Sequence, residues 1–323
     1  MPTARRISLR TIQGFAAIAL ALTGCSSLGS TPMAATPIAQ PGALSPRAGG
    51  GVAQRPAAAS QDLYLGNILG GVPLYSTGKN PHQVGDINNQ LPRVTSVWVN
   101  KPGNLYAFTD NRNVPYETIE EFKPGATSPF YSLVVQRYGF FVAADANDNV
   151  YAQGENGQAQ EVIDVYPPNS QSYAHEYVVP AIGTMSGPQG MAFDSAGNLL
   201  VGVAADAKDR QGQVGQVFRL DAGTGQFVSL NLQKALGGLI ATDAAGNLYV
   251  GGQTEIAVYA SGATTPSRIV HTTDTIVALT AASNGTLYVD TYKGIVVYTP
   301  GKSHAKTSFA PQAQVSGLAL GPG

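Results

Sequence analysis

One short pattern returns along the chain at intervals that only a repeat architecture explains. It has the form Asn-Leu-Tyr-Val after a Gly or Asp, and it begins at Asn104, Asn149, Asn198, Asn247 and Thr286. Successive copies are 39 to 49 residues apart. Self-similarity with a period of this size is typical of solenoids, propellers and related arrays, in which each unit packs against its neighbours. The pattern therefore predicts one repeat domain rather than several unrelated domains.

Each repeat is expected to contribute four short strands. In the repeat at 190–203, an apolar strand enters the turn 194–197, where Asp caps the turn and Gly supplies a positive φ, and an alternating strand returns. A third apolar strand ends in an aromatic residue before a Gly/Pro turn, and a fourth apolar run follows. The six aromatic markers are Tyr75, Phe122, Tyr166, Phe218, Tyr259 and Tyr298. Four strands in about 40–50 residues make one blade of a β-propeller.

The two ends of the body complete the sixth blade. Residues 316–323 look like a first strand and turn without a partner, and residues 62–65 look like the returning strand without its predecessor. We therefore predict an all-β fold, a six-bladed β-propeller of four-stranded antiparallel blades that spans residues 62–323. Pairing of the C-terminal strand with the N-terminal blade would close the ring and leave no free blade interface.

The best-formed repeat resembles a known family. Residues 187–202, GPQGMAFDSAGNLLVG, are similar to the NHL-repeat consensus P-x-G-I-A-V-D-x-x-G-N-L-Y-V, and the likeness covers most of 94–300. The repeats at 94–135 and 139–180 lack the opening Pro-x-Gly, and Asn100 and Asp148 replace the usual residues of the turn. The resemblance implies a propeller of the NHL and gluconolactonase-like superfamily, which means a fold and a binding surface rather than one reaction.

Residues 1–24 have the features of a secretory signal peptide. Arg5, Arg6 and Arg10 precede an apolar run at 12–22, which is too short to span a bilayer. The run ends in Leu-Thr-Gly-Cys, which resembles a bacterial lipobox. That resemblance implies cleavage before Cys25, the single cysteine, followed by acylation with palmitate-type chains. An ordinary signal peptide remains the alternative, and the Arg pair leaves twin-arginine export open although Ser8 departs from that motif.

Residues 25–61 are rich in Ala, Pro, Gly and Ser and have no periodic apolar face. Such a segment buries too little surface to offset its ordering entropy, so we expect a lipidated, disordered tether. Together these segments predict an exported lipoprotein of the cell envelope, anchored to the membrane through Cys25. In proteobacterial lipoproteins, whose signal this segment resembles, a Ser at the position of Ser26 usually accompanies outer-membrane sorting, so the resemblance implies the outer membrane if the cell has one.

Composition excludes several classes of function. Five arginines and no acid precede Asp62, so the body is net acidic and a poor partner for nucleic acid. One cysteine excludes a disulfide framework and a cysteine-cluster zinc site. No nucleophile elbow, phosphate loop or dinucleotide fingerprint occurs. We expect no cofactor and no metal, and a monomer. The four histidines, which lack metal-ligand spacing, are predicted at the surface: His82, His175, His271 and His304.

Enzymes of the gluconolactonase-like branch hold a divalent cation in the channel with Glu, Asn and Asp side chains, so the strand ends that should reach the channel are the candidate ligands. Only Asp290 is acidic there, and Asn67, Thr109 and Gln153 are neutral oxygen donors. These four are the candidate ligand-binding residues. Asp145, Asp194 and Asp243 recur before Gly and are predicted as structural turn caps. The repeated tyrosines are predicted to pack between blades, with carbohydrate stacking as the alternative.

These observations favour a binding role over catalysis. We predict a lipid-anchored envelope propeller that binds a protein, a peptide or a glycan through one face. The loops at 109–117 and 204–213 are the blade-specific segments where such a site is expected. The alternatives are a metal-dependent hydrolase or lyase of the gluconolactonase-like type, with Asp290 and Asn67 among its ligands, and a scaffold with no small ligand.

Overall fold

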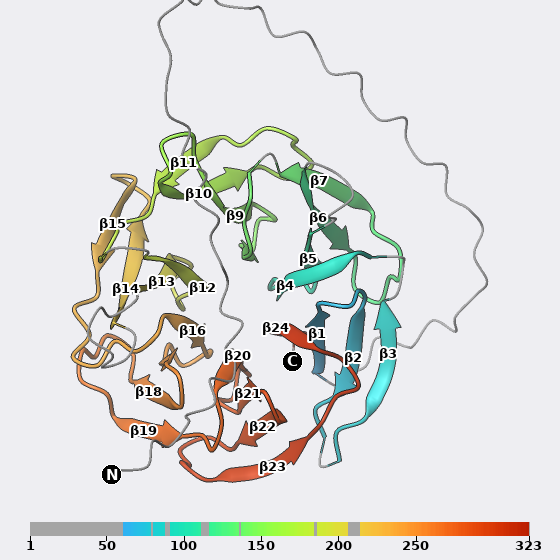
Figure 1. Ribbon diagram of the computed structural model, residues 1–323, viewed down its shortest axis with the longest axis vertical. Coiled ribbons are helices and arrows are strands. Elements are labelled where there is room, and N and C mark those ends of the chain that lie inside the picture. Colours follow the sequence, from blue (N-terminus) through green and yellow to red (C-terminus); the bar gives the residue numbers. More distant parts are fainter. Residues whose placement is uncertain are drawn as a thin grey trace, which may run out of the picture. The chain divides into compact units, whose positions relative to one another are not determined.

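The computed structural model describes residues 61–78, 80–87, 91–110, 116–135, 137–183, 186–205 and 214–322. The predicted signal peptide, the predicted lipidation site Cys25 and almost all of the predicted tether lie outside the described residues, as do 111–115 and 206–213 of the two blade-specific loops. Within this part of the chain the strands form six four-stranded sheets, arranged as blades in a ring (Figure 1). The predicted six-bladed propeller is therefore confirmed.

The first three blades each run from an innermost strand at the centre of the ring to an outermost strand at its rim. Blade A is β24 (Val315–Leu320), β1 (Asp62–Asn67), β2 (Val72–Ser76) and β3 (Gln83–Ile87). Blade B is β4 (Arg93–Val99), β5 (Leu105–Asp110), β6 (Glu117–Phe122) and β7 (Tyr131–Val135). Blade C is β8 (Val142–Ala144), β9 (Val150–Glu155), β10 (Glu161–Tyr166) and β11 (His175–Val178).

The other three blades follow the same order. Blade D is β12 (Gly187–Phe193), β13 (Leu199–Ala205), β14 (Val214–Asp221) and β15 (Gln226–Ser229). Blade E is β16 (Leu239–Thr242), β17 (Leu248–Gly251), β18 (Glu255–Tyr259) and β19 (Arg268–His271). Blade F is β20 (Ile276–Ala281), β21 (Leu287–Thr291), β22 (Gly294–Tyr298) and β23 (Ala305–Phe309). None of the described residues forms a helix that could span a membrane.

The antiparallel order of the strands gives the ring two distinct faces. We call the face where the innermost strands begin the upper face; the loops between the second and third strands also lie there. The innermost strands end at the lower face, which carries the Asp-x-x-Gly-Asn turns. β1 begins at the lower face, because Leu63 pairs with Leu320 near the end of β24. Gln61, the first described residue, therefore lies at the lower face.

Ring closure follows the prediction from the two ends of the sequence. β24 pairs with β1 from Leu63–Leu320 to Asn67–Val315, and Figure 1 shows these two strands side by side. The hydroxyl of Ser316 donates to the carbonyl of Val94 at 2.6 Å, which also ties the closing strand to blade B. The last strand of the described residues thus completes the blade that the first described strand begins.

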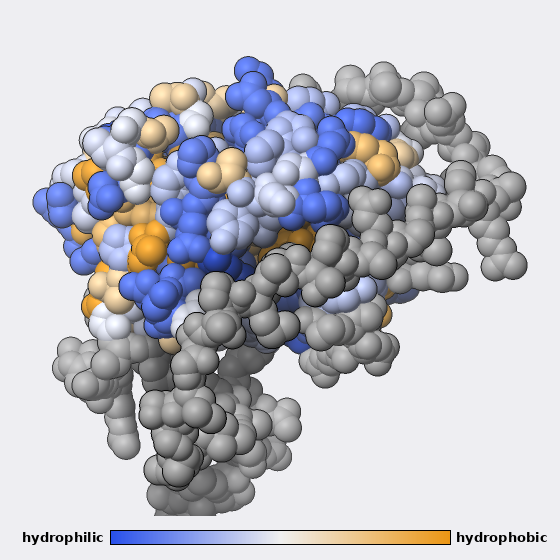
Figure 2. Space-filling model, turned by 90° about the horizontal axis from the view of Figure 1, so that it is seen from above, coloured by the Kyte–Doolittle hydropathy of each residue, from blue (hydrophilic) through white to orange (hydrophobic). Residues whose placement is uncertain are grey.

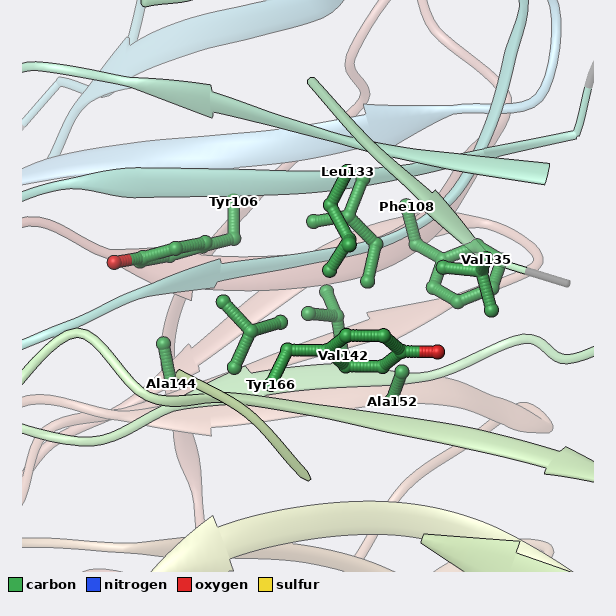
Figure 3. Close-up of a cluster of buried hydrophobic side chains, with 10 residues drawn as sticks. Tyr106, Phe108, Leu133, Val135, Val142, Ala144, Ala152 and Tyr166 are labelled. Atoms are coloured by element: carbon green, nitrogen blue, oxygen red, sulfur yellow. The ribbon is translucent and has the colours of Figure 1, made fainter. Parts of the chain in front are cut away.

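The core lies between neighbouring blades. Figure 3 shows one such cluster, in which Tyr106, Phe108 and Leu133 of blade B lie against Val142, Ala144 and Tyr166 of blade C. Each fully buried Leu or Phe contributes about 1.5–3 kcal/mol of transfer free energy. The tyrosines of the repeated motif belong to these clusters; Tyr106 and Tyr249 are almost completely buried. Their recurrence is therefore explained by packing between blades.

Candidate functional site

The innermost strands enclose a central cavity of about 260 Å³. Its wall is mainly apolar: Trp98, Phe141, Phe193 and Leu279 are examples. Trp98 packs edge-on against Phe193 at 5.8 Å and donates from Nε1 to the carbonyl of Ala144. The polar side chains among the described lining residues are all neutral, namely Gln61, Ser96, Gln189, Thr242, Thr280 and Ser316.

This lining does not fit the divalent cation that the gluconolactonase-like resemblance implies. A calcium-type ion takes six to eight oxygen ligands and prefers carboxylates, but the described wall of the cavity has no carboxylate. The described residues also contain no group of three or more His, Cys, Asp or Glu side chains placed to hold a metal. We therefore derive no chemical step through a metal at this position.

The four candidate ligand-binding residues lie outside the described lining of the cavity. Asp290 on β21 is 4% exposed, and burial raises the pKa of its carboxyl to about 7, while the Thr291 N–H opposes the shift. Tyr288, on the same side of β21, packs in the cluster between blades F and A, so Asp290 extends that line toward the upper face. Asn67 closes the loop after β1 by donating to the Gly70 carbonyl and accepting from the Leu69 N–H.

Thr109 and Gln153 are both buried and hydrogen-bonded within the fold. The Thr109 hydroxyl lies 2.7 Å from the hydroxyl of Thr118 on the next strand. The amide of Gln153 accepts from the Phe140 N–H at 2.8 Å and donates to Glu161 at 2.7 Å. Thr109 therefore links two strands within blade B, and Gln153 links segments of blade C. Neither side chain lines the central cavity.

Asp145, Asp194 and Asp243 have the same hydrogen-bond pattern in blades C, D and E. One carboxylate oxygen accepts from the backbone N–H groups two and four residues later, and the other accepts from the amide of the motif Asn. This pattern explains why Asp and Asn recur four residues apart. It is the arrangement of a capped turn.

Glu117 and the exposed apolar side chains of the upper face are features that sequence reasoning missed. Glu117 begins β6 and is 6% exposed. Its Oε2 accepts from the Gly139 N–H at 2.8 Å, while its Oε1 is buried and has no hydrogen-bond partner among the described residues. Burial raises the pKa of this carboxyl to about 7, against the effect of the Gly139 hydrogen bond. Both segments that this bond joins carry an exposed tyrosine immediately before the bonded residue, Tyr116 and Tyr138.

Half of the large hydrophobic side chains that are exposed in the described part of the propeller lie on upper-face loops of blades F, A and B. They are Leu69 (79% exposed), Tyr292 (78%), Tyr138 (63%) and Tyr116 (39%). On the side of the ring shown in Figure 2, hydrophobic residues form small groups separated by hydrophilic ones. The sequence offered one indication of these exposed side chains, which is their position. Each lies in a short loop between the second and third strands of a blade or between two blades.

The likeness to known proteins is confined to the fold. No family model and no curated protein matches the sequence. Among solved structures, a Bacteroides caccae protein of unknown function is 12% identical with a TM-score of 0.58, and the match covers 81% of this chain and 99% of the other. The propeller domain of Myceliophteria thermophila Cps50 (Swd1) is 12% identical with a TM-score of 0.53, covering 80% and 85%.

Kuenenia stuttgartiensis hydrazine synthase is also similar, at 11% identity and a TM-score of 0.51, with 72% of this chain and 90% of the other covered. Three such different proteins share the propeller and little sequence. The comparisons therefore support the β-propeller class, which is compatible with a binding module, and they assign no activity.

Proposed function

We propose that this chain is an NHL-like propeller of the cell envelope, exported and held to the membrane by lipid on Cys25, and that it binds a partner protein through its upper face. The observation that carries the proposal is the set of exposed apolar side chains on that face, Leu69, Tyr116, Tyr138 and Tyr292. Exposed apolar groups gathered on one surface are a common mark of interaction sites, and tyrosines are enriched among the residues that dominate binding energy.

A protein partner suits these side chains better than a glycan. Sugars stack on the flat faces of aromatic rings, whereas the most exposed member of the set, Leu69, has no ring. The four side chains also come from three consecutive blades. An area of this width suits contact with another protein. Burying a Leu or Tyr side chain contributes about 1.5–3 kcal/mol before the costs of association.

The order of the strands supports an orientation in which the upper face points away from the membrane anchor. Gln61 leads into β1 at the lower face, so a tether that precedes it would reach the propeller on that side. A body held in this way presents its upper face away from the anchor. A hydrolase or lyase role is not proposed, because the described channel wall lacks the acidic donors such a site needs.

Site-specific photo-crosslinking in the full-length chain tests the partner. A photoreactive amino acid at position 69 or 292 should yield the same protein adduct, and Tyr138→Ser should reduce its amount at least several-fold. Positions 130 and 228 are the controls, because Phe130 and Val228 are exposed apolar residues away from the upper face (42% and 47%). Equal adducts from the control positions, or adducts with lipid alone, would overturn the proposal.

The anchor is tested separately. Cys25→Ser should abolish labelling by an azide-bearing palmitate analogue and move the protein from the membrane fraction to the soluble fraction, while Ser26→Ala leaves labelling intact. Labelling that persists in Cys25→Ser would show that the lipid is not on this cysteine. Two or more acyl chains suffice for stable membrane attachment, whereas one is marginal.

A further inference from the structure

We propose that a pocket on the lower face, between blades E and F, binds a small oxyanion, a phosphate or a carboxylate, through Arg268. The pocket has a volume of about 460 Å³. Blade E contributes the turn residues Asp243 and Asn247 together with Ser267 and Arg268, and the Ser283–Gly285 turn of blade F forms the opposite wall. The loop after β22 closes one side with Pro300 and Gly301.

The guanidinium of Arg268 has no anionic partner among the described residues. Nε and Nη1 are buried and have no hydrogen-bond partner among the described residues. The other two partly buried arginines are paired: Arg93 with Asp110 at 3.1 Å, and Arg137 with Asp164 and Glu176 at 3.3 and 2.6 Å. A charged donor left unpaired in a partly buried site is costly unless a ligand group satisfies it.

The carboxylate of Asp243 lines the same pocket but forms no ion pair with Arg268, because its oxygens are used within blade E. It accepts from the N–H groups of Ala245 and Asn247, from the Asn247 amide, and from the hydroxyl of Tyr249 at 2.9 Å. The turn of blade F adds no second acid, because Ala282 stands where blades C, D and E have the capping Asp. The pocket thus holds one guanidinium and one carboxylate, and the acceptors of that carboxylate are already used by its own turn.

Arg268 is also specific to its blade. The residues at the same register position on the outermost strands of the other blades are Gly85, Tyr131, His175, Val228 and Thr307. A residue needed for blade packing would recur around the ring, as the motif tyrosines do. A cation that occurs once, beside a polar pocket, is better explained by a ligand.

The lining suits an oxyanion. Arginine is the side chain best matched to carboxylate and phosphate oxygens because its donors form a planar fork. Ser283 and Asn284 add hydroxyl and amide groups at the wall, and Gly301 is followed by the exposed Lys302. The pocket is large enough for an anion that is part of a larger molecule.

Calorimetric titration of the full-length chain tests the site, with inorganic phosphate and acetate as separate probes at constant ionic strength. We expect saturable binding of at least one probe and at least a tenfold loss of affinity in Arg268→Gln. Arg268→Lys, which keeps the charge without the fork, should retain part of the affinity. Arg219→Gln is the matched control, because Arg219 is an exposed arginine on β14 outside the pocket; it should bind like wild type.

Thermal unfolding distinguishes a ligand site from a structural role. Without the anion, Arg268→Gln should unfold at the same temperature as wild type or higher, since it removes unpaired buried donors. Added phosphate or acetate should raise the unfolding temperature of wild type and not of the variant. Absence of saturable binding of both probes, unchanged affinity in Arg268→Gln, or destabilisation of that variant without the anion would overturn the proposal.

Discussion

At the scale of single residues, the two departures from the repeat in blades B and C compensate each other. Asn100 replaces the capping Asp of blade B, and Asp148 occupies the Gly position of the next turn with a φ of 62°. Asp148 Oδ1 accepts from the amides of Asn100 and Asn104 and from the hydroxyl of Tyr106, at 2.6, 2.8 and 2.9 Å. In blade E the equivalent Tyr249 donates to the cap of its own blade. The carboxylate that accepts from the motif tyrosine of blade B therefore comes from the neighbouring blade C.

This exchange predicts a rescue. Asp148→Gly should lower the free energy of unfolding by about 1–3 kcal/mol, because it leaves buried donors unpaired. Asn100→Asp should also destabilise, because it sets a second carboxylate beside Asp148. The double variant recreates the blade E arrangement and should regain most of the loss. Denaturant unfolding of all four proteins measures the coupling; additive effects of the two substitutions would contradict the exchange.

At the scale of elements, the outer edge of β7 is covered by a side chain from the next blade. The amide of Gln171, in the loop after β10, accepts from the Val134 N–H at 3.0 Å and donates to the Ser132 carbonyl at 2.8 Å. These are the groups that a further strand would use. Covering an edge in this way is a recognised means of preventing sheet-to-sheet association.

We therefore expect Gln171→Ala to self-associate rather than to unfold. The freed backbone groups are solvated, so the loss of stability should stay below about 1 kcal/mol, while sedimentation velocity should show oligomers that grow with concentration. Gln226→Ala is the matched control, because Gln226 is an exposed glutamine on β15, the outermost strand of blade D. A monomeric Gln171→Ala protein at all concentrations would refute the edge-covering role.

The strands could be predicted from the sequence because their motifs recur in every blade. The candidate sites could not, because the residues that distinguish them belong to no repeated motif. The period of the Asn-Leu-Tyr-Val motif predicts the blades, and the unmatched ends predict the pairing of β24 with β1. Arg268 and Glu117 belong to no repeated motif. They stand out only in three dimensions, where buried polar atoms of both side chains have no hydrogen-bond partner among the described residues. Asp290 shows the limit of counting along a strand, because one position decides whether a side chain faces the channel or the neighbouring blade.

At the scale of the whole molecule, the ring depends on one short strand. Deleting residues 315–323 removes β24 and exposes the β1 edge together with Leu63 and Leu65, which pack with Leu318. We expect thermal unfolding to shift down by more than about 10 °C, since several buried apolar side chains lose their cover. A synthetic peptide of residues 311–323 should restore part of the shift in a concentration-dependent way.

The control for that deletion is removal of residues 322–323 alone, which leaves β24 intact. This shorter variant should unfold within a few degrees of the full chain. If the longer deletion also unfolds at the wild-type temperature, closure through β24 does not stabilise the propeller. Peptide rescue is the decisive measurement, because a general effect of shortening the chain would not respond to the missing strand.

Four buried carboxyl groups, distributed over blades B, C and F, give the molecule an unusual dependence on pH. Burial raises the pKa of Glu117, Glu121 and Asp290 to about 7 and that of Asp164 to about 6. In the unfolded chain such groups titrate near 4. Between these pH values the folded protein holds protons that the unfolded chain has lost. The contribution of the four carboxyl groups to the free energy of unfolding is therefore fully present below the unfolded pKa, and it is lost as the pH rises through 6–7.

The opposing groups act at lower pH. Burial tends to raise the pKa of Asp148, but three side-chain hydrogen bonds hold it below its usual range; Arg137 lowers that of Glu176, and Lys234 lowers that of Glu255. Their contribution is present above pH 4 and is lost below it. The unfolding temperature should therefore be highest near pH 5, fall between pH 5 and 8, and stay level above pH 8, with about 1–3 kcal/mol at stake per buried group.

Glu117→Gln isolates one of these groups. The amide oxygen can still accept from the Gly139 N–H, but the side chain no longer titrates. The fall in unfolding free energy between pH 5 and 8 should shrink by roughly a quarter, because one of four groups has been removed. Glu155→Gln, an exposed residue on β9, is the control and should leave the slope unchanged. A wild-type stability that rises from pH 5 to 8 would mean that these carboxyls are ionised in the folded propeller, with partners that lower their pKa.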